Sequence, residues 1–192
     1  MMTFILALFL APPALPGPLQ EATPLIDNNR VTVREVNSAA GKAAPTDGRN
    51  HDRVVIDLVK TTAFFVPKGG VYGMSGHAIL IDLKDVSIPP VPNQTPYPLA
   101  FPREGVKKIL ENNRVIIWDY TWTPGKPTAM HFHDKDVVVV YLADGQLKST
   151  TPDRKSDVNT ISFGLTRFNA PNRSHSEELV KGSGRAIITE FK

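Results

Sequence analysis

The sequence predicts an all-β protein with little helix. From Leu25 onward, short segments rich in Val and Ile alternate with clusters of Gly, Pro, Asn and Asp, a pattern typical of antiparallel strands joined by turns. With 192 residues, 41% of them hydrophobic and only 21% charged, the chain is long enough to bury a core. Many short strands and almost no helix indicate a sandwich or a barrel.

Each expected strand is a short Val- or Ile-rich run bounded by turn residues. The segments are 30–36, 54–60, 63–67, 77–84, 114–123, 136–142, 146–150, 160–163, 166–169, 175–180 and 185–191. Segment 103–112 fits either a helix or a short strand before the turn at Asn112 and Asn113, and the pattern leaves the two open.

The first 22 residues differ from the rest of the chain. Met1 to Ala11 form an apolar run of the length of a signal-peptide core, followed by a small-residue and Pro-rich stretch. We expect a signal peptide or an apolar arm packed on the domain, and a periplasmic or secreted protein, with a cytoplasmic one as the alternative. The run is too short to span a membrane, so no stable membrane insertion is expected.

A Pro-rich segment, 86–104, divides the remainder into two halves, 23–85 and 105–192. Because proline has no amide N–H, this segment is expected to be an extended connector and not a central strand. The halves resemble each other: segment 25–31 (LIDNNRV) matches 109–115 (ILENNRV), and the end of the first half matches the C-terminus. We therefore expect an internal duplication.

Two histidines in the second half are candidate metal ligands. In a strand, side chains alternate between faces, so His131 and His133 point the same way and Phe132 points to the other face. Two imidazoles on one rigid strand make half of a metal site. The alternative is a pair of exposed loop histidines.

The spacing around this pair resembles the first motif of the cupins, which are small jelly-roll barrels. Gly125, five residues and the His131-x-His133 pair fit that motif. Four residues separate His133 from Val138, which stands where cupins have a glutamate. Gly145 matches the glycine that ends the motif.

The second cupin motif has a counterpart of the right length. It begins at Gly164, and His175 stands at its ligand position. In its Pro-x-Gly turn, Ala170 replaces the proline and Asn172 replaces the glycine, and Leu179 replaces the Asn that ends the motif. Asn tolerates a left-handed backbone well, so the turn is feasible without glycine. The resemblance implies a double-stranded β-helix barrel, with two cupin-like halves sharing strands.

The resemblance also implies a metal site formed by His131, His133 and His175. Such imidazoles accept a divalent transition metal: Fe, Mn, Ni, Cu or Zn. With Val138 in the glutamate position, the ion keeps its full charge and should prefer an anionic or chelating oxygen ligand. Some cupin dioxygenases use three histidines with ferrous iron, so this resemblance predicts an enzyme of oxygenase type. The alternative is a barrel that has lost its metal.

The first half lacks this chemistry. Arg49 and His51 stand where the second half has its first two histidines, the turn at 67–69 is an intact Pro-x-Gly, and Tyr72 replaces the third histidine. We expect a degenerate, structural half that covers the barrel or lends it strands. His51 and His77 are expected to be surface or core residues and not ligands.

Acidic residues lie close to the candidate ligands. Glu177 follows His175 by two residues and should share its face, as a fourth ligand, a general base or an exposed carboxylate paired with a lysine. Asp134 and Asp136 are expected to be turn and surface residues.

Aromatic residues alternate along one expected strand. Trp118, Tyr120 and Trp122 share a face with Ile116, which favours a core position over a pocket. Tyr120, the only phenol among them, is a candidate for substrate contact.

The composition limits the partners. The net charge is +3 and the basic residues are scattered, so nucleic acid is not expected. The absence of cysteine leaves His, Asp and Glu as ligands. A small-molecule ligand or substrate is expected, with a homodimer possible. The alternative function is a non-catalytic, ligand-binding or structural barrel.

Overall fold

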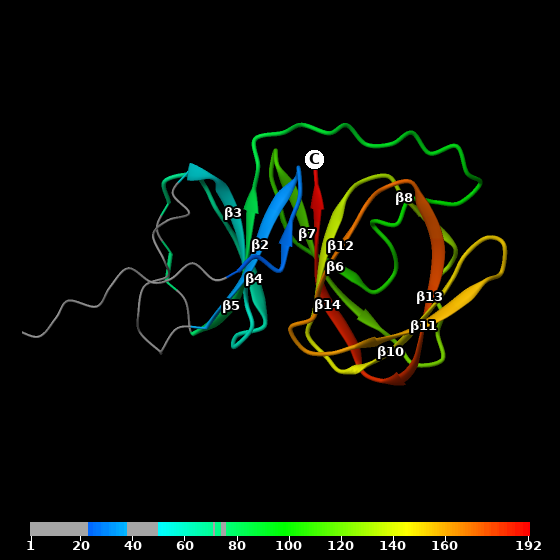
Figure 1. Ribbon diagram of the computed structural model, residues 1–192. Helices are drawn as coiled ribbons and strands as arrows, with labels where there is room; N and C mark the ends of the chain where they lie inside the picture. The colour runs from blue at the N-terminus through cyan, green and yellow to red at the C-terminus, as the bar shows by residue number, and fades with distance from the viewer. Residues whose placement is uncertain (1–22, 38–49, 71, 74–75) are drawn as a thin grey trace, which may run out of the picture.

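The computed structural model describes residues 23–37, 50–70, 72–73 and 76–192 (Figure 1). Within these ranges the chain forms fourteen β-strands and no α-helix, so the expected all-β fold is confirmed. None of the described segments is a helix long and apolar enough to cross a membrane. The expectation for residues 1–22 lies outside the described residues, as does Arg49.

The first half forms one antiparallel sheet in the order β1-β2-β5-β3-β4. Its strands are β1 (Ile26–Asp27), β2 (Val31–Asn37), β3 (Asp52–Asp57), β4 (Thr62–Val66) and β5 (His77–Leu83). At the start of β2, Val31 and Val33 are buried and point to one face, as a sheet packed against a core requires.

The second half forms the two sheets of a jelly roll, in the orders β11-β10-β13-β8 and β12-β9-β14-β7-β6. Their strands are β6 (Val106–Glu111), β7 (Val115–Trp122), β8 (His131–His133), β9 (Val137–Tyr141), β10 (Gly145–Thr150), β11 (Ser156–Ile161), β12 (Thr166–Asn169), β13 (Arg173–Gly182) and β14 (Gly184–Phe191). The ambiguous segment 103–112 is therefore a strand over most of its length.

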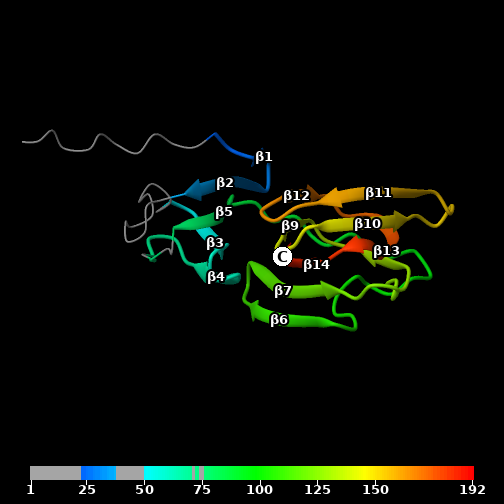
Figure 2. The same ribbon diagram turned by 90° about the horizontal axis from the view of Figure 1, so that it is seen from below.

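Two hydrophobic clusters hold three sheets together, because β7, β9 and β14 bury both faces. On one face, Val138, Val140 and Ile187 pack against the sheet of the first half. On the other face, Val139 and Ile188 belong to the interior of the barrel. Figure 2 shows the first-half sheet lying against the side of the barrel. In the described residues the halves share a core and not strands, so the first half covers the barrel.

The repeated sequence forms the same turn twice. The Asn28 side chain accepts hydrogen bonds from the amides of Arg30 and Val31 at 2.8 and 3.0 Å. Asn112 does the same for Arg114 and the next residue at 2.8 and 2.9 Å. An Asn side chain that bonds the backbone two and three residues later fixes a tight turn. The internal match in the sequence therefore corresponds to a structural match.

The two arginines of these turns cross between the halves. Arg30 donates to the carbonyl of Lys192 at 2.7 Å, and Arg114 donates to the carbonyl of Lys84 at 2.9 Å. Each arginine of one half thus bonds the end of the last strand of the other half. We name these two contacts the reciprocal arginine pair.

Strand boundaries depart from the expected ones where a side chain starts a turn. The expected strand 54–60 instead ends at Asp57, because the Asp57 carboxylate accepts the amides of Val59 and Lys60 at 3.0 and 2.9 Å. The expected strand 160–163 is β11, which begins earlier, at Ser156. The short β1 was not expected from the sequence.

The Pro-rich connector crosses the barrel and pairs with β8 (Figure 1). The amide of Phe132 donates to Pro98, and the carbonyl of Phe132 accepts from Ala100, both at 2.8 Å. This pairing places Arg103, near the end of the connector, beside the candidate ligands.

Candidate metal centre

The three predicted ligands meet inside the barrel. His131 and His133 lie on β8, and the register of β13 against β8 places His175 opposite His131. One ligand atom from each ring lies within 4.8 Å of the others. His131 and His133 are buried, so the alternative of two exposed loop histidines is wrong.

One pair of rings is spaced like two ligands of one metal ion. The Nε2 atoms of His133 and His175 face each other at 3.1 Å. Two nitrogens each about 2.1 Å from one ion are about 3.0 to 3.4 Å apart in octahedral or tetrahedral geometry. The Nδ1 of His131 is 2.8 Å from the carbonyl of Ala129, to which it can donate, and this leaves its Nε2 lone pair for a ligand.

Burial keeps these imidazoles in the neutral form that binds metal. Burial, followed by the charge of Arg103, lowers the pKa of His131 to about 4. Burial also lowers the pKa values of His133 and His175, assisted by the positive charge of Arg173. At neutral pH a metal therefore has no protons to displace from the folded protein.

The metal-free protein is expected to lose stability as the pH falls below about 6.5. There the unfolded chain protonates these three histidines while the folded chain does not, so the free energy of unfolding falls until the folded form also takes protons, near pH 4 for His131. Urea unfolding from pH 7 to 4 measures this. The matched control replaces all three with Asn and should show a shallower fall; an equal slope would contradict the prediction.

Arg103 lies against the imidazole ring of His131. One guanidinium nitrogen lies 2.9 Å from the Nε2 of His131, and the other donates to Glu177 at 3.0 Å. The guanidinium also lies over the ring of Tyr120, 4.3 Å from its centre. The positive charge of Arg103 thus lies beside a ring that would bind a metal ion. The sequence did not single out Arg103, because the connector brings it from 28 residues away.

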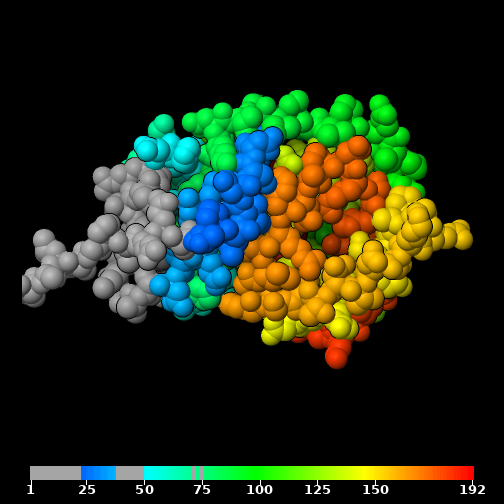
Figure 3. Space-filling model, in the orientation of Figure 1, coloured from blue at the N-terminus to red at the C-terminus, as the bar shows by residue number. Residues whose placement is uncertain are grey.

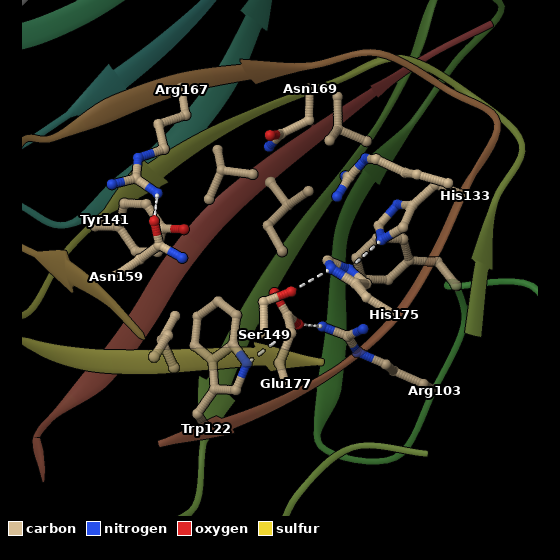
Figure 4. Close-up of a pocket in the computed structure, with 16 residues that line it drawn as sticks. Arg103, Trp122, His133, Tyr141, Ser149, Asn159, Arg167, Asn169, His175 and Glu177 are labelled. Atoms are coloured by element: carbon tan, nitrogen blue, oxygen red, sulfur yellow. Dashed lines mark hydrogen bonds and ion pairs between the residues drawn. The ribbon is translucent and has the colours of Figure 1, made fainter. Parts of the chain in front are cut away.

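Glu177 shares the face of His175, as expected, and points into the cavity (Figure 4). The expected alternative, an exposed carboxylate paired with lysine, is wrong, because Glu177 is largely buried and pairs with Arg103. The indole N–H of Trp122 also donates to it at 3.3 Å. Burial would raise the pKa of Glu177, but the charge of Arg103 holds it below its ordinary value. Glu177 is therefore ionised, and its role in catalysis stays a prediction.

The aromatic residues of β7 are buried in the barrel, as their pattern indicated. Trp118 donates its indole N–H to buried Glu190 at 2.7 Å. Tyr120 lines a second cavity of about 390 Å³ together with His131 and Arg103. Its contact with a substrate stays a prediction.

Val138 does not face the candidate ligands. It is fully buried in the cluster between the barrel and the first half, whereas its neighbours Val137 and Val139 line the cavity. The spacing of four residues after His133 therefore predicted the wrong residue for this position. Val137, one residue earlier, faces the site. Since Val137 is also apolar, the centre still lacks the carboxylate that cupins place here.

Asp134 and Asp136 were expected at the surface, and this expectation is wrong. Both are buried, at 8% and 7% exposure. Asp136 approaches Arg30 at 3.8 Å, and Asp134 pairs with Lys135 at 2.7 Å. Asp136 is thus held by a residue of the first half, which no local pattern reveals.

The turn of the second motif forms as expected. Asn172 has a φ of 61°, in the left-handed region, and its amide donates to the carbonyl of His133 at 2.9 Å. In the first half, Tyr72 stands in the place of a ligand and accepts a hydrogen bond from Arg53 at 2.8 Å. His77 pairs with Glu35 at 2.6 Å.

A cavity of about 250 Å³ lies against His133 and His175, and Figure 3 shows the surface hollowed among the orange and yellow atoms of this region. Ser149 is 3.0 Å from the Nδ1 of His175. Polar residues of strands β11 to β13 also line this cavity, and no sequence pattern had indicated them: Asn159, Arg167, Asn169 and Arg173. Only Arg173, two residues before His175, could have been found by the same-face rule.

No family model matches the chain, and no curated protein does. Solved structures do match. A cupin 2 conserved barrel domain protein from Leptotrichia buccalis is 12% identical over 93% of this chain and 92% of its own, with a TM-score of 0.48. A cupin domain from Bordetella pertussis is 23% identical over 51% of this chain and 98% of its own, with a TM-score of 0.42. The polyketide cyclase RemF from Streptomyces resistomycificus is 15% identical over 50% of this chain and 70% of its own, with a TM-score of 0.39.

Proposed function

We propose that this chain, a cupin by its fold, is a metal-dependent enzyme of oxygenase type that acts on a small molecule. One observation carries the proposal: His131, His133 and His175 converge within 4.8 Å of one another beside a cavity. Three neutral imidazoles suit a divalent Fe, Mn, Ni, Cu or Zn ion and leave positions for substrate. Such an ion would supply Lewis acidity and, if redox-active, the electrons for reaction with oxygen.

The residues around the centre divide the remaining work. Ser149 and Ala129 hold two imidazole rings in orientation through their Nδ1 atoms. Glu177, ionised and within the cavity, can accept a proton from a bound substrate. Apolar side chains on the barrel side exclude water from the rest of the cavity.

Metal analysis tests this proposal. Purified protein, reconstituted with each candidate ion in turn, is expected to hold one equivalent per chain, because the described residues contain one such histidine cluster. A His131→Ala/His133→Ala variant should hold none. A His77→Ala variant, which removes a histidine paired with Glu35 on the first-half sheet, should bind like the wild type. Wild-type protein that binds none of these ions would overturn the proposal.

A second candidate function is a non-catalytic barrel that binds a small ligand. It is favoured by Arg103, whose positive charge lies against the His131 ring and disfavours a cation there. Oxygen uptake separates the two functions, because a binding protein saturates with diketones, thiols or phenolic acids without turnover.

A further inference from the structure

One wall of the cavity is polar, and it runs from Arg173, which pairs in register with His133, to residues of β11 and β12. Asn159 from β11 and Arg167 and Asn169 from β12 line it, as Figure 4 shows, and Arg173 from β13 joins them. The register places Arg167 opposite Val139, which faces the same cavity. We name these four residues the arginine wall.

Its two arginines have no carboxylate partner among the described residues. Arg167 makes long hydrogen bonds of 3.4 Å, to the Asn159 side chain and the carbonyl of Thr160, and lies over the ring of Tyr141, 5.9 Å from its centre. Arg173 donates its Nε to the carbonyl of Ala170 at 3.0 Å, and neither of its terminal nitrogens makes a described hydrogen bond.

The cavity offers these arginines no acid of its own. Glu177 is the one carboxylate among the residues that line it, and Arg103 already pairs with Glu177. Half-buried guanidinium groups without a counter-ion are costly, and a ligand that supplies the anion removes that cost. The arginine wall is therefore complementary to an anion.

The rest of the cavity defines the body of the ligand. Its other sides are largely apolar and include an indole and a phenyl ring; the lining residues there are Phe101, Trp122, Val137, Val139, Leu147 and Ile188. The volume of about 250 Å³ admits only a small molecule. A ligand that fits is therefore charged at one end and apolar along its body.

We infer that the arginine wall binds the carboxylate of a small, largely apolar acid, whose opposite end carries oxygen atoms that lie at the three histidines. Guanidinium groups pair with the two coplanar oxygens of a carboxylate through parallel N–H bonds. The placement of the oxygen-bearing end at the three histidines rests on the proposed function, whereas the carboxylate site does not. The carboxylate site narrows the substrate class from any chelating small molecule to carboxylic acids.

Two probe pairs test the inference by calorimetry. The first pair, 3,4-dihydroxybenzoate and catechol, differs only in the carboxylate and is titrated under nitrogen into protein loaded with Zn²⁺, which does not oxidise the probes. The second pair, benzoate and phenyl phosphate, is titrated into metal-free protein, so that the arginine wall is probed without the metal centre.

We expect 3,4-dihydroxybenzoate to bind the Zn²⁺ protein at least about tenfold more tightly than catechol. This difference in affinity corresponds to one or more charge-assisted hydrogen bonds to the carboxylate. Arg167→Met and Arg173→Met should each remove most of this difference, and Arg173→Lys should retain part of it. Arg154→Met, which removes an exposed arginine outside the cavity, is the matched control and should bind like the wild type. Thermal unfolding confirms that each variant is folded.

The outcomes separate the two proposals. Equal affinity for catechol and the acid overturns the carboxylate site but leaves the metal centre standing. Benzoate binding to metal-free protein that depends on Arg167 and Arg173 supports the carboxylate site even if no metal binds. Tighter binding of phenyl phosphate than of benzoate overturns the assignment to carboxylic acids.

Discussion

Replacing Arg103 with Met is expected to tighten metal binding by about a hundredfold. One guanidinium nitrogen lies 2.9 Å from the Nε2 of His131, so a metal bound there lies close to a positive charge. Even with the strong screening of a polar site, a positive charge a few ångströms from a divalent ion costs several kcal/mol. Removing it also releases Glu177, which Arg103 now holds at 3.0 Å, to act as a fourth ligand.

Competition with a chromophoric chelator for Zn²⁺ measures this effect. Arg103→Lys, which keeps the charge, is the matched control and should stay close to the wild type. An Arg103→Met/Glu177→Gln variant then separates the two causes, because it removes the repelling charge without supplying a carboxylate. If Arg103→Met binds Zn²⁺ no more tightly than the wild type, Arg103 does not compete with the ion.

Removing the reciprocal arginine pair is expected to cause the largest loss of stability. Arg30 is only 4% exposed and donates to the carbonyls of Lys192 and Val86 at 2.7 and 3.1 Å. Arg30→Met should lower the free energy of unfolding by about 2 to 4 kcal/mol, because it leaves buried acceptors and the nearby Asp136 carboxylate unpaired. Arg114→Met should cost less, since Arg114 is more exposed.

Urea unfolding measures both losses, with Arg154→Met as the control for a lost surface charge. In the double variant, the transition should broaden or split, because both polar contacts between the strand ends of the halves are gone. The shared hydrophobic cluster and the contact of Arg185 with Thr61 then couple the halves. A single sharp transition at the wild-type midpoint would show that the arginines do not couple the halves.

The sequence predicted what depends on short-range periodicity. Alternation along a strand placed His131 and His133 on one face and Glu177 beside His175, and the structure agrees on both. The Asn-Asn-Arg-Val repeat was visible because the same turn needs the same side chain at the same place. The left-handed position of Asn172 followed from the known tolerance of Asn.

Features set by tertiary packing could not be predicted in the same way. Val138 was assigned to the site by counting through a loop, and an error of one residue in a strand moves a side chain to the opposite face. Asp136 looked like a surface residue because its partner, Arg30, lies 106 positions earlier in the chain. Arg103 and Arg167 reach the cavity through the connector and through β12, and neither carries a local signal.

The pairing of the connector with Phe132 has a consequence for assembly. Strand β8 lies at the end of its sheet, and the bond donor and acceptor of its middle residue are both taken by the connector. Open strand edges recruit further strands and lead to aggregation, and proline-rich chain cannot continue such a ladder. The strand that carries two of the three candidate ligands is thereby closed to pairing with another molecule, and the cavity beside it stays open for small molecules.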